Sequence, residues 1–338
     1  MSACPNKRAA FHVVNLPALV NLLPFFPGMR FPRIASFLLL GALALSAQAA
    51  TPSYLIVESQ TGYIFFDQGA RVKRQVGSLT KVATACVVLD WTDKKGGDLN
   101  QLATINQADF FGEEKNEIGW QPGDTATIRD LLYAALVQSD NIAANALART
   151  VGETLISGAP AGKVTPVALF VGQMNALAKS LGMQRTRFAN PTGYDQRERP
   201  MPFSTAEDLA RLTRYAVNKA SFRFYVSQRQ REITIGRAGK PLHYTLRTTN
   251  DLLGTNGIDG VKTGQTARAG ECLILSANRE AEVIKGETSA TIYPRHLIIV
   301  VLGSNDRFGD GQRLLQQGWQ LYDQWAAAGR PVDPKKTL

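Results

Sequence analysis

The chain has 338 residues, of which 44% are hydrophobic and 20% charged, with 29 Gly, 16 Pro and 3 Cys. This composition provides a buried core for one large domain or two ordinary ones, and it excludes a collagen, a coiled coil, a small disulfide scaffold and a chain disordered throughout. The net charge of +10 raises the question of an anionic partner such as nucleic acid or a membrane surface.

The N-terminal segment is predicted to be a secretory leader. Arg30 and Arg33 precede an apolar run over residues 34–45, and Ala47 and Ala49 form a small-x-small cleavage site. The run is shorter than the about 20 residues that span a bilayer. We therefore expect residues 1–49 to be a leader whose signal peptide is cleaved after Ala49, with a short uncleaved anchor as the alternative.

Met29 is our hypothesised start, because prolines interrupt residues 1–28 and Met29 would begin a compact signal peptide. The leader contains Lys7, Arg8, Arg30 and Arg33 and no acidic residue, so part of the positive charge belongs to it. The remaining chain has no run of five like charges, and a nucleic-acid partner is not expected.

A hairpin of two strands opens the mature region, at residues 53–58 and 63–67. The stretch after Ser78, residues 79–91, is apolar on nearly every face and predicts a buried helix. Hydroxyl caps, acidic first turns and apolar periodicity then predict four more helices. These helices cover residues 131–138, 143–151, 168–183 and 206–217.

Short β-rich runs follow at residues 231–236, 243–248, 271–278 and 295–304, and an amphipathic helix at 311–329 ends the pattern. This order predicts an α+β fold in which both ends of the chain form one antiparallel sheet and the helical middle forms an inserted lobe. Cys86 and Cys272 lie in apolar runs and are expected to be buried free thiols, with a disulfide as the alternative.

Three short motifs carry the candidate chemistry: Ser78–Lys81, Ser139–Asn141 and Lys262–Gly264. Ser78 and Lys81 are three residues apart at a helix start and therefore share one face. A serine needs a neighbouring base to become a nucleophile, and Lys81 supplies one only as a neutral amine. Lowering a lysine pKa from ~10.4 to ~7–8 requires roughly 4 kcal/mol, which a second ammonium group at about 4 Å provides.

Lys262 is the candidate for that second cation. Ser139 is a candidate proton relay to the leaving group, and Asn141 a candidate ligand of a substrate amide. Each motif also has an ordinary structural interpretation: Ser78 as a helix cap with Lys81 in solvent, the second motif as a turn, and Lys262–Gly264 as a hairpin start. Their order and local context favour the catalytic interpretation.

Together the motifs resemble those of the penicillin-binding proteins and serine β-lactamases, most closely the low-molecular-mass D-alanyl-D-alanine carboxypeptidases and endopeptidases. The likeness extends over about residues 52–325 and includes FVGQMNALAKSLGMQRTRFANPTGYD at 170–195 and GIDGVKTGQTARAGECL at 257–273. It implies a β-lactamase/transpeptidase-like fold, with an antiparallel sheet flanked by helices and an inserted helical lobe. It also implies acyl-enzyme chemistry on peptidoglycan stem peptides, with β-lactams as inhibitors.

The resemblance assigns roles to individual residues. Ser78 is the implied nucleophile, Lys81 its base, and Ser139 the second catalytic element. Backbone N–H groups of Ser78 and Gln265 would form the oxyanion hole. Arg307 stands where the family places a carboxylate-binding arginine, with a surface arginine as the alternative. The implied substrate-binding set is Asn141, Lys262, Thr263, Gly264, Gln265 and Arg307.

Two departures from the wider pattern bear on activity. Asp140 occupies the middle of the second motif, as in many β-lactamases, where many relatives have Gly. No Glu-x-x-Leu-Asn segment follows it, so an efficient β-lactamase with a deacylating glutamate is not favoured. The alternatives that remain are a β-lactamase and a penicillin-binding sensor or scaffold without turnover.

We therefore expect a periplasmic serine DD-peptidase without a membrane anchor, with a catalytic domain over residues 50–330 and a C-terminal tail over 331–338. No cofactor is expected. His243 and His296 lack metal-ligand spacing and are expected in strands, so no metal site is predicted.

Overall fold

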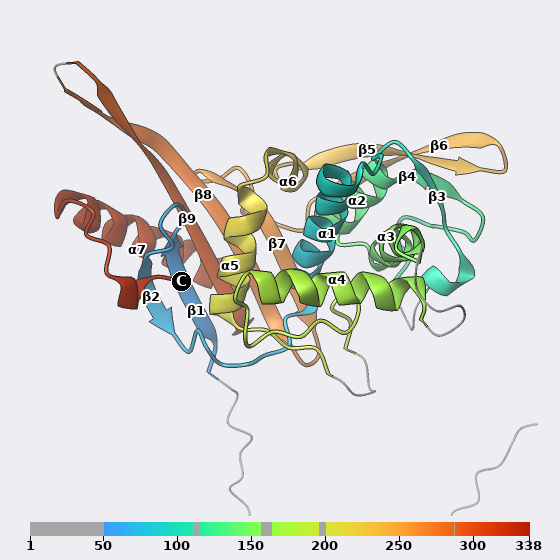
Figure 1. Cartoon of the computed structure of the whole chain (residues 1–338), viewed down its shortest axis with the longest axis horizontal. Coiled ribbons are helices and arrows are strands. Elements are labelled where there is room, and N and C mark those ends of the chain that lie inside the picture. Colours follow the sequence, from blue (N-terminus) through green and yellow to red (C-terminus); the bar gives the residue numbers. More distant parts are fainter. Residues whose placement is uncertain (1–50, 111–114, 157–163, 196–200, 287) are drawn as a thin grey trace, which may run out of the picture. The chain divides into compact units, whose positions relative to one another are not determined.

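The computed structural model describes residues 51–338 apart from 111–114, 157–163, 196–200 and 287. The predicted signal peptide and Met29 lie outside the described residues. Ala50–Leu338 form one compact unit, and the elements below all belong to it (Figure 1).

A five-stranded antiparallel sheet forms the centre of the unit, and both ends of the chain contribute to it, as predicted. The strand order is β2-β1-β9-β8-β7. The strands are β1 (Ser53–Glu58), β2 (Ile64–Gln68), β7 (Ile258–Thr266), β8 (Gly270–Lys285) and β9 (Ala290–Ser304).

The middle strand β9 shows why the sheet is covered on both faces. Its side chains alternate between two cores: Leu297, Ile299 and Val301 pack in one, whereas Ile298, Val300 and Leu302 pack in the other. Helix α7 (Arg307–Ala327) covers the first face, and α5 (Ala206–Val217) lies against the second (Figure 1). Both helices were predicted, although α7 begins earlier than expected. Asp306 caps its N-terminus, because its Oδ1 accepts a hydrogen bond from Gly309 N.

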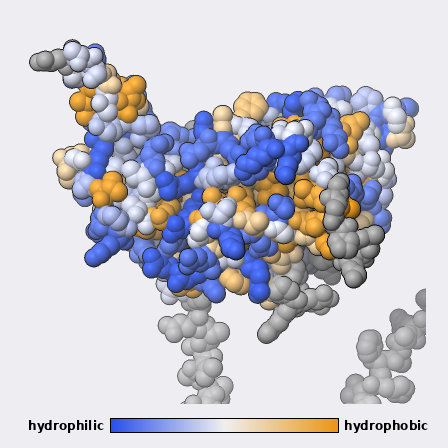
Figure 2. All heavy atoms as spheres, in the orientation of Figure 1, coloured by the Kyte–Doolittle hydropathy of each residue, from blue (hydrophilic) through white to orange (hydrophobic). Residues whose placement is uncertain are grey.

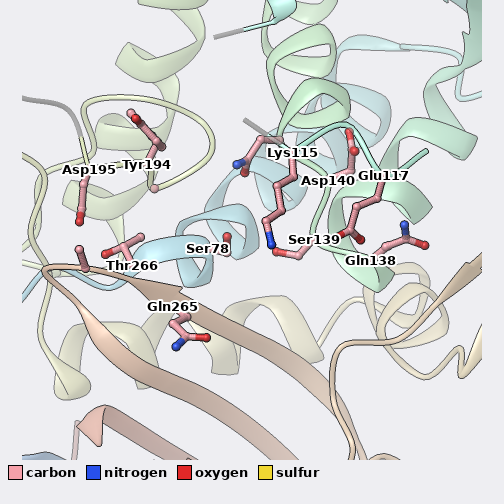
Figure 3. Close-up of a pocket in the computed structure, with 13 residues that line it drawn as sticks. Ser78, Lys115, Glu117, Gln138, Ser139, Asp140, Tyr194, Asp195, Gln265 and Thr266 are labelled. Carbon is pink, nitrogen blue, oxygen red and sulfur yellow. The ribbon is translucent and has the colours of Figure 1, made fainter. Parts of the chain in front are cut away.

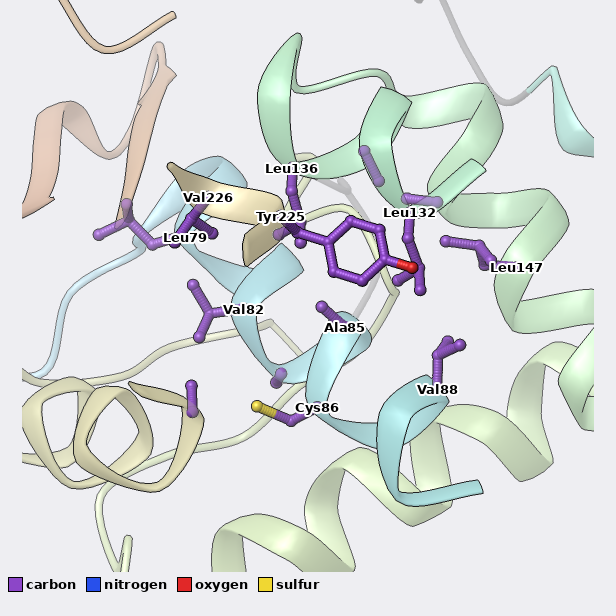
Figure 4. Packing of buried hydrophobic residues seen from close by; sticks show 14 of the residues in the cluster. Leu79, Val82, Ala85, Cys86, Val88, Leu132, Leu136, Leu147, Tyr225 and Val226 are labelled. Carbon is purple, nitrogen blue, oxygen red and sulfur yellow. The ribbon is translucent and has the colours of Figure 1, made fainter. Parts of the chain in front are cut away.

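The helical lobe is built around α1 (Lys81–Lys95), whose first nine residues are all buried. This confirms the helix predicted from a run that is apolar on nearly every face. Figure 4 shows Ala85 and Val88 of α1 on the side of Leu132 and Leu147, and Val82 on the side of Leu79 and Val226. The surrounding helices are α2 (Ile128–Val137), α3 (Asn141–Thr154), α4 (Pro166–Ser180) and α6 (Ala220–Val226), with short 3-10 turns η1 (Gly77–Thr80), η2 (Gln107–Asp109) and η3 (Pro334–Lys336).

A second, four-stranded sheet lies beside this lobe and was not predicted. Its order is β3-β4-β5-β6. The predicted strands near residues 231–248 belong to it rather than to the central sheet. The two short strands that complete it are too brief to show periodicity in the sequence. The strands are β3 (Leu102–Thr104), β4 (Thr125–Thr127), β5 (Gln230–Arg237) and β6 (Lys240–Arg247).

Strands β8 and β9 continue past the sheet as a two-stranded hairpin that carries exposed apolar side chains (Figures 1 and 2). Val283 is 50% exposed and Ile292 62% exposed, and they pair across the hairpin. The last residues of the chain pack against the turn between β1 and β2, where Leu338 N donates to Gly62 O.

Cys86 and Cys272 are free and buried, as expected. Burial raises the pKa of the Cys272 thiol to about 11 and raises that of Cys86 as well. His243 and His296 lie in β6 and β9, which confirms their assignment to strands. Among the described residues, every helix is too short or too polar to cross a bilayer.

Candidate active site

The first motif sits at the junction of η1 and α1, in the interior of the molecule. Ser78 lies on the 3-10 turn, and Lys81 is the first residue of α1. Lys81 is fully buried, and its Nζ lies 2.9 Å from Ser78 Oγ. The prediction that the two side chains share one face is therefore confirmed, with a 3-10 turn in place of the α-helical one.

Two carbonyl groups also contact the Lys81 side chain. Its Nζ donates to Asn141 Oδ1 and to the backbone oxygen of Thr192 at 3.2 Å. The contacts with Ser78, Asn141 and Thr192 therefore hold the side chain in one orientation. Asn141, predicted to contact substrate, also fixes the lysine.

The second motif forms the turn between α2 and α3. Ser139 adopts a φ of 67°, an uncommon left-handed conformation for a residue with a side chain. Asp140 caps α3, because its Oδ1 accepts a hydrogen bond of 2.6 Å from Ala143 N. The turn proposed as the ordinary structural interpretation is present, and it places Ser139 and Asn141 beside Ser78.

The third motif lies on β7, at the edge of the central sheet. This strand passes very close to the turn that carries the serine. A Cβ atom on Gly264 would lie 2.8 Å from Val76 O and 3.2 Å from Ser78 N. Glycine is therefore required for this approach, which brings Gln265 next to the same turn.

Lys262 is almost fully buried, and its Nζ donates to Thr263 O at 3.1 Å. Burial is the largest cause that lowers the pKa of Lys262, followed by repulsion from Lys81 and Arg307. Lys81 therefore contributes to the lowered pKa of Lys262, whereas the predicted effect of Lys262 on Lys81 stays a prediction.

Arg307 begins α7 and reaches the same edge strand. Its Nη1 donates to Gly264 O at 3.2 Å, and its backbone N donates to a carboxylate oxygen of Glu271. Its Nε is buried without a hydrogen-bond partner among the described residues. The structure thus places Arg307 beside the third motif rather than on a remote surface.

A pocket of about 460 Å³ opens over Ser78. Figure 3 shows Ser78 near its centre, with the Lys115 side chain directed towards Ser139. Among the predicted site residues, Ser78, Ser139, Asn141 and Gln265 line it. The lining residues that were not predicted to belong to the site are Lys115, Glu117, Gln138, Asp140, Gly193, Tyr194, Asp195, Thr266 and Ala267.

The loop over residues 190–195 closes one side of the pocket. A Cβ atom on Gly193, whose φ is +80°, would lie 1.8 Å from Gly77 O. Thr84 Oγ1 of α1 donates to Pro191 O at 2.6 Å, which fixes the loop to the helix. The loop belongs to the stretch at residues 170–195 that resembles the family, and none of its residues was predicted to belong to the site. Its contact with Lys81 through Thr192 explains why it belongs to the site.

Comparison with known proteins gives a consistent result. A family model described as D-alanyl-D-alanine carboxypeptidase matches residues 42–285. The chain is 30% identical to a D-alanyl-D-alanine endopeptidase of Pseudomonas aeruginosa, covering 80% of this chain and 78% of the relative. It is 28% identical to the D-alanyl-D-alanine carboxypeptidase DacC of Escherichia coli over 85% of this chain, and it spans 64% of that relative's length.

Solved structures agree with these sequence relatives. A Streptomyces DD-transpeptidase has a TM-score of 0.67 at 27% identity, covering 79% of this chain and 96% of the other. A penicillin-binding protein from Listeria monocytogenes, in its ampicillin-bound form, has a TM-score of 0.61 at 27% identity with the same coverage. The β-lactamase/transpeptidase-like α+β fold expected from the motifs is confirmed.

Proposed function

Because this chain belongs to the D-alanyl-D-alanine carboxypeptidase family of serine peptidases, we propose that it is a serine DD-peptidase acting on peptidoglycan stem peptides. The observation that carries the proposal is the contact of 2.9 Å between Lys81 Nζ and Ser78 Oγ in a buried setting. A nucleophile and its base within hydrogen-bond reach are what acyl transfer needs.

In the proposed acylation step, Ser78 Oγ attacks the carbonyl carbon of the D-alanyl-D-alanine bond and gives its proton to the neutral amine of Lys81. Backbone N–H groups of Ser78 and Gln265 stabilise the oxyanion, and one such donor contributes roughly 3 kcal/mol. The close approach of Gly264 to Ser78 N supports this pairing. As the carbon–nitrogen bond breaks, the leaving amine takes a proton through Ser139, which yields an ester on Ser78.

Deacylation reverses these roles. Water loses a proton to Lys81 and attacks the ester, and as the ester bond breaks Lys81 returns a proton to Ser78 Oγ, which frees the serine and the shortened peptide. The carboxylate of the leaving residue is assigned to Lys262, Thr263 and Arg307, a group of cationic and hydroxyl donors that suits an anion. The buried Arg307 Nε without a described partner supports the assignment. Asn141 is assigned to a substrate amide as well as to Lys81.

The proposed substrate also bears on where the protein works. A substrate in the cell wall and the predicted signal peptide together favour export, so we propose a periplasmic enzyme that remodels peptidoglycan, with β-lactams as inhibitors. The similarity to a protein solved with ampicillin bound supports β-lactam binding. No cofactor, metal or nucleic acid enters this proposal.

Two assays on the full chain test the activity. A stem pentapeptide should release D-alanine, or a cross-linked muropeptide dimer should be split, and the ratio of the two rates separates carboxypeptidase from endopeptidase. Labelled penicillin should remain bound during the assay. Stable labelling with neither peptide reaction would favour a sensor or scaffold, and rapid penicillin hydrolysis would favour a β-lactamase; either result would contradict the proposal.

A further inference from the structure

Thr249, in the connection between β6 and β7, links two of the three motifs. Its backbone N donates to Val137 O at 3.1 Å, at the end of the helix that leads into Ser139. Its Oγ1 lies 2.6 Å from Thr263 Oγ1, in the third motif. No pattern in the sequence singled out this residue, because it lies outside all three motifs.

The backbone around Thr249 is anchored independently of its side chain. Thr248 N donates to Arg229 O at 2.9 Å, and Asn250 Nδ2 donates to Gly260 O at 3.4 Å. With Thr249 N bonded to Val137, three consecutive residues are tied to three different segments. The hydroxyl of Thr249 is therefore available for a role other than holding the connection in place.

The contact between the two hydroxyl groups has a chemical consequence. Each threonine hydroxyl has one proton to donate and two lone pairs that accept. If Thr263 donates to Thr249, its proton is used and cannot reach a ligand. If Thr249 donates to Thr263, the Thr263 proton remains free for an acceptor in the site, and the two bonds in series strengthen one another.

We propose that Thr249 is a positioning residue for carboxylate recognition: it donates to Thr263, so that the Thr263 hydroxyl presents its proton to the substrate's carboxylate. Thr263 itself is only 4% exposed, which limits the other partners that can orient it. This inference rests on the proposed function, because it assigns the acceptor to the carboxylate of a D-alanyl substrate or of a β-lactam.

Valine has nearly the shape of threonine without the hydroxyl, so Thr249→Val tests the proposal on the full chain with benzylpenicillin as the probe. We expect the dissociation constant of the pre-acylation complex to rise about tenfold, because the hydrogen bond from Thr263 to the charged carboxylate of the ligand is weakened. The acylation rate constant at saturation should change less than threefold. Thr249→Ser, which keeps the hydroxyl, should restore binding to within about threefold of the unsubstituted chain.

Two controls separate positioning from a structural role. Thr248→Val removes a hydroxyl one residue away and should leave penicillin binding within about twofold. In a Thr263→Val background, Thr249→Val should cause little further loss, because the hydroxyl that it positions is gone. Thermal unfolding of each variant confirms that it is folded.

The proposal is overturned if Thr249→Val binds penicillin as tightly as the unsubstituted chain, if Thr249→Ser fails to restore binding, or if the tenfold loss persists in the Thr263→Val background. If the unsubstituted chain itself takes up no penicillin, the proposed function fails first and this inference falls with it.

Discussion

Lys81 Nζ lies 2.9 Å from Ser78 Oγ, and the lysine that makes this contact is fully buried. A lysine buried in the first turn of a largely apolar helix needs polar partners for its ammonium or amine group. Here the partners include Ser78, Asn141 and the backbone oxygen of Thr192. The buried position that is costly for a lysine therefore places an amine directly against the candidate nucleophile.

Removing that amine should abolish acylation while the fold persists. We expect Lys81→Ala to lower the rate of penicillin acylation by about 10²-fold or more, the usual contribution of a general base. Stopped-flow acylation measures the rate, and circular dichroism checks the fold. Lys95→Ala, an exposed lysine on the same helix, is the matched control and should react normally. An unchanged acylation rate in Lys81→Ala would refute the proposed base.

The lowered pKa of Lys262 predicts a pH dependence of ligand binding. Burial, Lys81 and Arg307 all favour the neutral amine, whereas a bound carboxylate favours the ammonium form, so binding takes up a proton. As pH rises through the lowered pKa, the affinity for benzylpenicillin should therefore fall, well below the pH at which an ordinary lysine titrates.

Lys262→Arg provides the comparison, because an arginine stays charged throughout this range. Binding by this variant should be nearly independent of pH over the same interval. If both proteins lose affinity in parallel as pH rises, the titration belongs to another group and the role given to Lys262 is wrong.

Asp140 is predicted to stabilise the folded state by capping the N-terminus of α3. Because its Oδ1 accepts from Ala143 N, Asp140→Ala should lower the free energy of unfolding by about 1 kcal/mol. Asp140→Asn keeps a capping oxygen and should stay within a few tenths of the original value. Urea unfolding curves decide the matter, and equal destabilisation by both substitutions would show that the carboxylate charge matters more than the cap.

His296 should make the protein less stable in mild acid. Its Nε2 lies 2.7 Å from Ser276 Oγ. Burial lowers its pKa most, Arg223 lowers it further, and the carboxylates of Asp259 and Glu58 oppose the shift. The unfolded chain therefore binds the proton more readily, so the stability present above about pH 6.5 is lost as pH falls from there through the lowered pKa.

We expect His296→Gln to flatten the dependence of unfolding free energy on pH between about 7 and 5. His243→Gln changes an exposed histidine on β6 and should retain the original slope. The same slope in His296→Gln would assign the acid sensitivity to other groups.

The sequence predicted much of this architecture, for physical reasons that can be named. Helix α1 was recognised because its buried run has apolar residues on nearly every face, and α5 because Thr205 caps a strongly periodic segment. The small second sheet was missed, since three-residue strands such as β4 have no measurable period. The strands predicted near residues 231–248 pair in that sheet. The local sequence predicts a strand, but which strands pair depends on tertiary contacts that it does not encode.

The candidate site shows the same division. Ser78, Lys81 and Asn141 meet as the motif order suggested, and Gln265, which only the family resemblance implied, lines the same pocket. Thr249 was missed because its proposed role depends on a contact with Thr263 of β7, which is distant in the sequence. Pocket residues such as Lys115 and Glu117 lie on a connection whose local sequence carries no chemical pattern.

The central claim is that Ser78 becomes acylated, and mass spectrometry of the intact chain after exposure to benzylpenicillin tests it most directly. We predict a mass increase of one penicillin per chain, located by peptide mapping on the fragment that contains Ser78 and absent from Ser78→Ala. An adduct that persists in Ser78→Ala, or no adduct on the unsubstituted chain, would contradict the account.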